Sequence, residues 1–301
     1  MTPRVSIITA TYNRSNVLQY TIRSVLDQTV QEWEMIIVGD CCTDDTEQVV
    51  ASFADPRIRF LNLPQNVGEQ SGPNNVGLKQ AQGAFIALLN HDDLWFPDHL
   101  ERGLDRLQQT AASVVIGMGV VVNPDSTYQL YGVFPDSRYR PVDFVPASGW
   151  MFRKTVLDEV GYWRSFRQLW IYPSQDWLIR VYRAGRTVLP THYLSWLAVP
   201  SGVRKNVYRD REEFENDRYY RQISANPQFR PEILSAVAVA NESNNRRFPV
   251  GALFRQIIKN SVIRLLLWIG VLPVQVRFMG RYWRKGGALN ALRKMRGLSK
   301  L

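Results

Sequence analysis

Short apolar segments alternate with helical patterns through the first 120 residues of the chain. Runs rich in β-branched and other apolar side chains occupy residues 5–9, 35–38, 58–63, 85–89 and 114–122. Between the first two runs, apolar side chains recur at the spacing of one helix face, at Val17, Leu18, Ile22, Val25 and Leu26. Strands separated by helical segments form βαβ units, so the pattern predicts an α/β fold with a mainly parallel sheet flanked by helices.

The remaining pattern divides the chain further. A stretch rich in Gly and Asn precedes the fourth apolar run and is predicted to be a loop. The pattern is then mixed and rich in aromatic side chains up to about residue 200, and helical after that. We therefore expect one α/β domain over residues 1–205, with parts 1–120 and 121–205, and a helical extension over residues 206–301.

The net charge of +10 belongs to the C-terminal part of the chain. From Arg246 to Leu301 there are thirteen Lys and Arg residues and no Asp or Glu, whereas the first 245 residues carry 24 basic and 27 acidic side chains. A basic tail of this kind suits anionic lipid or nucleic acid. No nucleic-acid recognition motif accompanies it, so we expect an anionic membrane surface as the partner and no nucleic acid.

Neither a disulfide framework nor a secretory signal is expected. The two cysteines, Cys41 and Cys42, are adjacent and cannot join distant segments. The N-terminal apolar run, residues 5–10, is too short for the core of a signal peptide, and no cleavage site follows it. These features predict a cytoplasmic protein.

Carboxylates follow two of the predicted strands. Asp40 comes directly after the second strand, and Asp92 and Asp93 come directly after the fourth. Ligands of open α/β sheets bind beyond the carboxyl ends of the strands. Two consecutive acids repel each other unless a cation lies nearby, and oxygen ligands at such a place suit Mg²⁺ or Mn²⁺. The sequence predicts a divalent metal there; the alternative for Asp93 is that it helps to cap the next helix.

Several motifs resemble glycosyltransferase family 2, an inverting family with the GT-A fold, over about residues 4–200. The segments that carry the resemblance are Val5-Ser6-Ile7-Ile8, Thr11-Tyr12-Asn13-Arg14, Val38-Gly39-Asp40, Asn66-x-Gly68, Asn75-x-Gly77 and His91-Asp92-Asp93-Leu94-Trp95. The resemblance implies a nucleotide-binding part over residues 1–120 and an acceptor part over residues 121–205. It also implies a nucleotide-sugar donor, with a UDP-sugar favoured.

The resemblance assigns donor-site roles to the matched positions. Asp40 corresponds to the acid that hydrogen-bonds the base. Asp92 corresponds to the last acid of the family's Asp-x-Asp motif, which coordinates Mg²⁺ or Mn²⁺, and Asp93 stands beside it. The other positions implied to contact the nucleotide-sugar are Thr11, Tyr12, Asn74, Asn90 and His91. Gly39, Asn74 and Asn90 depart from the family pattern, which leaves open which base is bound.

The segment Ser174-Gln175-Asp176 resembles the family segment that carries the general base beside the acceptor. The resemblance implies that Asp176 takes the proton of the acceptor hydroxyl, while a divalent cation offsets the charge of the departing diphosphate. Trp150 and Trp177 are candidates for stacking on sugar rings on the acceptor side, because aromatic faces pack on apolar carbohydrate surfaces. The expected acceptor is a lipid-linked or glycan hydroxyl.

The basic extension also carries an apolar stripe at helical spacing, at Phe254, Ile257, Ile258, Val262 and Leu265. Its longest apolar run, residues 265–274, is too short for a membrane span, which needs about 20 residues. Basic and aromatic side chains on such a helix are typical of attachment in the headgroup region. We expect a peripheral position at the inner face of the cell membrane; the alternative is that the stripe packs on the catalytic core.

Two other functions stay open. A membrane-surface nucleotide-sugar-binding protein with impaired catalysis would account for Asn90 and Gln175, which stand where the family has acids. A nucleotidyltransferase also needs a parallel sheet and a metal-binding acid. However, residues 9–14 contain no glycine, whereas that class has a Gly-rich phosphate loop after its first strand.

Overall fold

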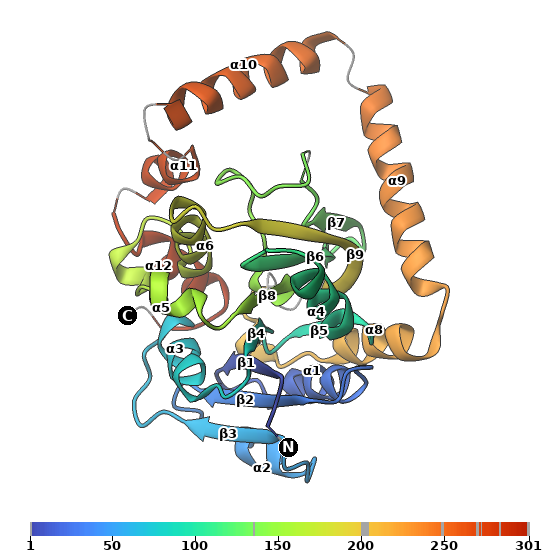
Figure 1. Cartoon of the computed structure of the whole chain (residues 1–301), viewed down its shortest axis with the longest axis vertical. Coiled ribbons are helices and arrows are strands. Elements are labelled where there is room, and N and C mark those ends of the chain that lie inside the picture. The colour runs from blue at the N-terminus through green and yellow to red at the C-terminus, as the bar shows by residue number, and fades with distance from the viewer. Residues whose placement is uncertain are drawn as a thin grey trace.

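The structure is a computed structural model that describes residues 2–134, 136–199, 205–247, 250–268, 271, 273–282 and 284–299. Nine strands form one sheet in the order β3-β2-β1-β4-β8-β6-β9-β5, with β7 paired to β6 (Figure 1). The strands are β1 (Val5–Thr11), β2 (Trp33–Gly39), β3 (Ile58–Asn62), β4 (Phe85–Leu88), β5 (Asp93–Trp95), β6 (Val114–Val122), β7 (Tyr128–Tyr131), β8 (Trp150–Arg153) and β9 (Val188–Ala198).

The first four strands follow the βαβ pattern that the sequence predicts. β1 lies between β2 and β4 and is parallel to both, with Thr11 opposite Gly39 and Ile8 opposite Leu88. β3 is parallel to β2 at the edge of the sheet. The connecting helices are α1 (Ser15–Leu26), α2 (Thr46–Ala51) and α3 (Ser71–Gln80). The prediction of an α/β fold is confirmed.

Beyond β4 the sheet becomes mixed. β8 is antiparallel to both of its neighbours, β4 and β6, and the β5–β9 and β6–β7 pairs are also antiparallel. Only β6 and β9 are parallel in this half. The sequence predicts a mainly parallel sheet because its clear strand and helix signals lie in the first 120 residues, whereas β7, β8 and β9 lie in the mixed aromatic region.

The stretch rich in Gly and Asn is not a continuous loop, and this prediction is wrong for residues 71–80. They form α3, with Pro73 in the first turn, where a backbone N–H has no intrahelical partner. Gly77 allows α3 to approach β1 closely, because a Cβ atom there would lie 2.6 Å from Cγ2 of Ile8. Tertiary packing therefore overrides the weak helix propensity of Gly and Asn.

Helices cover both faces of the sheet. Side chains of α1, α2 and α4 (His99–Gln109) pack on one face, and those of α3, α5 (Val156–Val160) and α6 (Pro173–Arg183) pack on the other. Two short 3₁₀ helices, η1 (Ala147–Gly149) and η2 (Phe166–Gln168), precede β8 and α6. The largest buried side chains are Trp33, Trp95, Trp150, Trp177 and Trp196, each of which is at most 2% exposed. Buried aromatic area of this size dominates the packing energy.

The helices after residue 205 contact the sheet domain at the beginning and at the end of this segment. They are α7 (Val207–Asp210), α8 (Phe214–Ala225), α9 (Phe229–Arg247), α10 (Val250–Trp268), α11 (Pro273–Tyr282) and α12 (Gly287–Met295). Figure 1 shows α9, α10 and α11 as an arch, with α10 away from the sheet and α12 back beside α6. The domain boundary expected at residue 205 adjoins residues 200–204, which lie outside the described residues.

The apolar stripe of α10 is exposed. Phe254, Ile257 and Leu265 are 65%, 61% and 58% exposed, and Trp268 at the end of the helix is 83% exposed. In the described part of the chain, these side chains therefore do not pack on the sheet domain. No helix among the described residues has the length and hydropathy that a membrane crossing requires.

A buried histidine at the start of α4 links folding to pH. His99 is stacked on Trp95 with ring centroids 4.1 Å apart, and its Nδ1 lies 3.0 Å from Oγ of Ser195. Burial lowers the pKa of His99 to about 3, although the charge of Asp98 acts in the opposite direction. The neutral imidazole is therefore the form that the folded protein holds at neutral pH.

We expect His99 to reduce stability as the pH falls. Its folded pKa lies below its unfolded value of about 6.5, so the unfolded chain takes up the proton first, and stability decreases from about pH 6.5 downwards. Between about pH 7 and pH 5 this group accounts for up to about 2 kcal/mol of the free energy of unfolding. Urea unfolding of His99→Gln should show a weaker pH dependence than the parent chain. His192→Gln, at an exposed site, is the matched control; equal pH dependence in both variants would contradict the assignment.

Candidate active site

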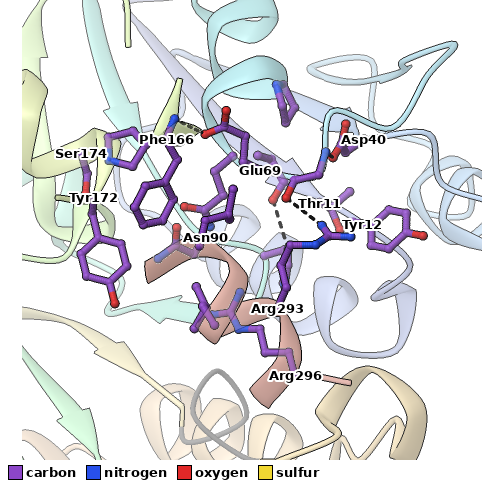
Figure 2. A pocket seen from close by; sticks show the side chains of 18 of the residues that line it. Thr11, Tyr12, Asp40, Glu69, Asn90, Phe166, Tyr172, Ser174, Arg293 and Arg296 are labelled. Carbon is purple, nitrogen blue, oxygen red and sulfur yellow. Dashed lines mark hydrogen bonds between the residues drawn. The ribbon is translucent and has the colours of Figure 1, made fainter. Parts of the chain in front are cut away.

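A cavity of about 230 Å³ opens at the carboxyl ends of β1, β2 and β4. Figure 2 shows that its wall comes from distant parts of the chain: Thr11 at the end of β1 and Tyr12 after it, Asp40 after β2, Asn90 after β4, and Arg293 and Arg296 from the C-terminal end. Tyr172 and Ser174 at the start of α6 line the opposite side. The cavity therefore brings together five of the predicted donor-side positions, the fifth being His91, with a C-terminal segment that the sequence does not single out. The predicted metal ligands Asp92 and Asp93 are not among the residues that line it.

Asp40 holds the loop beside the cavity. Its backbone N–H donates to the carbonyl of Thr11 at 2.8 Å, which fixes the end of β2 against the end of β1. Its two carboxylate oxygens accept from the backbone N–H groups of Val67 and Gly68, each at 2.7 Å. Burial raises the pKa of Asp40, and these two hydrogen bonds partly oppose that shift. Asp40 thus orders the loop that leads into α3 and also lines the cavity.

Glu69 is a cavity residue that the sequence analysis does not identify. Its carboxylate accepts from Oγ of Ser165 and, at 2.6 Å, from the backbone N–H of Phe166. These contacts join the donor-side loop to η2, in the second half of the sheet domain. A single acid in a loop carries no sequence signal for such a role.

The end of β4 carries a network of buried polar groups. Asn90 lines the cavity and donates through Nδ2 to Oδ2 of Asp93 at 2.8 Å, and Oγ of Ser148 donates to the same oxygen. Burial raises the pKa of Asp93 to about 8, and the charge of Asp92 adds to the shift. His91 also lines the cavity, and its Nδ1 lies 3.1 Å from the carbonyl oxygen of Ala10; burial lowers its pKa. Asp93 therefore positions Asn90 and Ser148 in this arrangement.

The residues around Asp92 fit a divalent cation that shares its coordination with a substrate. The described part of the chain contains no group of three or more His, Cys, Asp or Glu side chains arranged to hold a metal by themselves. Mg²⁺, however, is commonly bound by one or two carboxylates together with substrate phosphates and water. Asp92 is half-buried, and its carbonyl accepts from Nδ2 of Asn216 at 2.9 Å, which fixes the loop. Asp92 with substrate oxygens meets that requirement.

Two polar groups near the cavity lack partners. Oγ1 of Thr11 and Nη2 of Arg14 are buried and have no hydrogen-bond partner among the described residues. Nη1 of Arg14 donates to the carbonyl of Val207 at 2.6 Å, and the guanidinium lies over the ring of Tyr208, which lines the cavity. A buried polar atom without a partner is costly, so the polar floor of the cavity is suited to a polar ligand.

The last helix completes the wall. Ala288 and Leu289 of α12 pack on Phe166 and Tyr172, and Leu289, Arg293 and Arg296 line the cavity. From the sequence, the whole basic tail is predicted to bind a membrane surface. The spacing of Leu289, Leu292 and Arg293 on one helix face is a signal that this part docks on protein instead.

Asp176, which is predicted to lie on the acceptor side, is not in the cavity wall. Its Oδ2 accepts from Nε of Arg180 at 3.0 Å, and its Oδ1 lies 3.8 Å from Nη1 of Arg164. Its neighbour Ser174, on the same first turn of α6, does line the cavity. The structure thus brings the helix that carries Asp176 to the cavity, while the carboxylate itself is held by two arginines.

Three predicted site residues lie elsewhere. Trp150 and Trp177 are fully buried in the core, with ring centroids 6.0 Å apart, and offer no exposed face to a sugar. The ring nitrogen of Trp177 donates to the carbonyl of Gly161 at 2.9 Å. Asn74 is buried in α3 and does not line the cavity. These side chains pack behind the site.

Comparisons with known proteins identify the family of the chain. A family model described as "Glycosyl transferase family 2" matches residues 6–161. A relative from Campylobacter jejuni, named GalNAc(5)-diNAcBac-PP-undecaprenol beta-1,3-glucosyltransferase, is 30% identical over 231 residues, which are 69% of this chain and 70% of the relative. The putative teichuronic acid biosynthesis glycosyltransferase TuaG of Bacillus subtilis is 39% identical over 113 residues, 37% of this chain and 44% of TuaG.

Other matches cover smaller parts or show the fold alone. The Escherichia coli protein WfgD, named as a UDP-Glc:alpha-D-GlcNAc-diphosphoundecaprenol beta-1,3-glucosyltransferase, is 35% identical over 40% of this chain and 48% of its own. This chain thus spans less than half the length of TuaG and WfgD. The structure of S. aureus TarS 1-349 in complex with UDP-GlcNAc has a TM-score of 0.56 at 22% identity, over 65% of this chain and 58% of TarS.

We expect Asp40→Asn to destabilise the chain. The amide keeps one acceptor oxygen but turns its NH₂ group towards a backbone N–H, so one buried donor loses its partner. Such a loss costs about 1–3 kcal/mol of the free energy of unfolding. Urea unfolding measures it, and Glu47→Gln on the exposed side of α2 removes the same charge as a control. Equal stability of the two variants would show that the carboxylate does not order the loop.

Proposed function

The chain belongs to glycosyl transferase family 2, and we propose that it transfers a sugar from a nucleoside diphosphate donor to a hydroxyl of a lipid-linked or glycan acceptor, with inversion at the anomeric carbon. The observation that carries the proposal is the cavity at the strand ends, with Thr11, Tyr12, Asp40, Asn90 and His91 in one wall. Family membership supports the reaction class, and the cavity supports its location.

Donor binding uses the half of the cavity beside β1 and β2. Oγ1 of Thr11 provides a buried polar group without a partner for a donor atom, and Asp40 keeps lone pairs on its carboxylate beyond the two backbone hydrogen bonds. Tyr12 offers an aromatic wall for the base. A UDP-sugar is the favoured donor, because the name of WfgD specifies UDP-Glc and TarS has been solved with UDP-GlcNAc.

Asp92 holds the divalent cation in this proposal. When bound, Mg²⁺ or Mn²⁺ acts as a Lewis acid that offsets the charge developing on the diphosphate. Asp92 would contribute a carboxylate oxygen, and the donor phosphates would supply further ligands. The neighbouring Asp93, with its raised pKa, keeps the loop in place through Asn90 and Ser148. The structure of PcManGT in complex with GDP-Man and Mn²⁺ has the same fold, with a TM-score of 0.55.

Asp176 is the proposed general base. Inversion by direct displacement requires one base to take the acceptor's proton on the face opposite the leaving group. The start of α6 lies across the cavity from Asp40, which supports an acceptor-side role for Asp176. Arg180 and Arg164 hold the carboxylate, and the acceptor hydroxyl must reach an oxygen that these arginines leave accessible.

We expect Asp176→Asn to lower the rate of sugar transfer by about 10²–10⁴-fold while donor binding is retained, because only proton removal is lost. Transfer from UDP-glucose and UDP-GlcNAc to a polyprenyl-diphosphate-linked sugar, with and without Mn²⁺, measures the rate. Asp158→Asn, an exposed acid on α5, is the matched control. A fully active Asp176→Asn variant would refute the base assignment; tight donor binding without any turnover in the parent chain would favour a binding protein.

The acceptor and the tail point to a membrane surface. The names of WfgD and of the Campylobacter jejuni relative both specify undecaprenol-linked diphosphate acceptors, which are lipids. In this chain, the exposed apolar stripe of α10 (Phe254, Ile257, Ile258, Val262 and Leu265) lies in a segment without acidic residues. An apolar face on a cationic segment is suited to lie in the headgroup region of an anionic bilayer, peripheral to its inner face.

We expect the double variant Ile257→Ser and Leu265→Ser to weaken binding to vesicles that contain anionic phosphatidylglycerol. Each buried aliphatic side chain contributes about 1.5–3 kcal/mol, so vesicle binding should fall at least tenfold. Co-sedimentation measures it, with Val239→Ser on α9, which is 66% exposed, as the control. Transfer to a water-soluble acceptor should not change. Unaltered vesicle binding would show that the stripe of α10 does not contact the membrane.

A further inference from the structure

Arg293 is a buried cation in the wall of the cavity. Only 7% of the residue is exposed. Its Nη1 donates to the carbonyl of Gly68 and its Nε to the carbonyl of Ser299, both at 2.8 Å. Among the described residues, no carboxylate lies within ion-pair distance of its guanidinium. Carbonyl oxygens satisfy its N–H groups in part, and its positive charge acts on the carboxylate of Asp40 without forming an ion pair with it.

Arg296 follows Arg293 by three residues, at the end of α12. Residues at this spacing lie on the same side of a helix, and both arginines line the cavity. Figure 2 shows the two side chains beside the space between Thr11 and Asn90. Arg296 is close enough to His91 and Tyr208 for its charge to act on both of them. The two guanidinium groups therefore face the cavity from one helix.

Their positions span the two ends of the donor site. Arg293 lies at the Asp40 end, since it binds the carbonyl of Gly68, whose N–H donates to Asp40. Arg296 lies at the end formed by His91 and Tyr208, next to the loop that carries Asp92. A nucleoside diphosphate with its base towards Asp40 and its phosphates towards Asp92 would lie next to both arginines.

A buried cation that makes no ion pair favours an anionic ligand. Burial of a charge is costly unless a partner of opposite charge accompanies it, and the guanidinium fork matches phosphate oxygens in geometry. Arg14, which is also buried and is bound to the carbonyl of Val207, adds a third guanidinium beneath Tyr208. Three guanidinium groups thus lie in or near the wall of the cavity, together with the carboxylates of Asp40 and Glu69.

We propose that α12 forms a wall of the donor pocket and that Arg293 and Arg296 bind the diphosphate of the nucleotide donor. This inference rests on the proposed function and extends it to residues outside the part of the chain that matches the family model. As the bond between the anomeric carbon and the diphosphate oxygen breaks, its electron pair passes to the diphosphate. The acceptor oxygen forms the new bond and its proton passes to Asp176. The two guanidinium groups stabilise the charge left on the diphosphate.

The test compares nucleotides that differ only in phosphate. Isothermal titration of the full-length chain with UDP, GDP and uridine gives the dissociation constants for the parent chain, Arg293→Gln and Arg296→Gln. Hydrogen bonds to a charged group are strong enough that each variant should bind the preferred diphosphate about 10- to 100-fold more weakly. Uridine, which has no phosphate, should bind Arg296→Gln and the parent chain equally. Lys294→Gln removes a charge from the exposed side of the same helix and should leave diphosphate affinity unchanged.

Arg293 also ties α12 to Gly68, so its loss can loosen the helix. Thermal unfolding of Arg293→Gln detects that, and Arg293→Lys, which keeps the charge, should restore part of the affinity. Arg296→Gln tests the charge without the Gly68 contact. Unchanged or tighter diphosphate binding in both glutamine variants would overturn the inference, with tighter binding marking α12 as a plug. A parent chain that binds diphosphate but transfers no sugar would overturn the proposed function alone.

Discussion

The parallel register of β1 between β2 and β4 determines where every donor-side group lies. Because Thr11 is opposite Gly39 and Ile8 is opposite Leu88, the carboxyl ends of the three strands lie on the same side of the sheet. The residues that follow these strands therefore lie near one another. The backbone hydrogen bond from Asp40 to Thr11 fixes this edge, and the carboxylate of Asp40 then fixes the loop at Val67 and Gly68. The cavity is thus a consequence of strand pairing, and its chemistry follows from what the sequence places after each strand.

The last helices give the basic tail two separate roles in this account. α10 presents its apolar stripe to the outside, whereas α12 folds back and packs on Phe166 and Tyr172. The composition assigns all of the positive charge of the tail to one membrane-binding segment. In the structure, part of that charge lies elsewhere, because Arg293 is buried in the cavity wall. In this arrangement the segment that approaches the acceptor's membrane is joined through α11 to the helix that contacts the donor.

The sequence predicts the first half of the fold, because periodicity is strong there, and it predicts that Asp40 follows a strand directly, as it does. It fails for α3, where close packing of Gly77 on Ile8 decides the conformation, and for the antiparallel strands of the aromatic region. It also cannot reveal Glu69 or Arg293, since their roles arise from contacts between segments far apart in the chain. For Trp150 the sequence suggests a sugar-binding role that the structure does not support, because this side chain is buried in the core.

The central claim is that segments far apart in the chain form one nucleotide-diphosphate pocket. Hydrogen–deuterium exchange of the full-length chain with and without UDP and Mn²⁺ tests it most directly. The account predicts slower exchange on addition of nucleotide in three segments at once, residues 11–14, 66–70 and 289–298, and no change in residues 254–265 of α10. Protection limited to the first two segments would remove α12 from the pocket, and protection in none of the three would contradict the site as a whole.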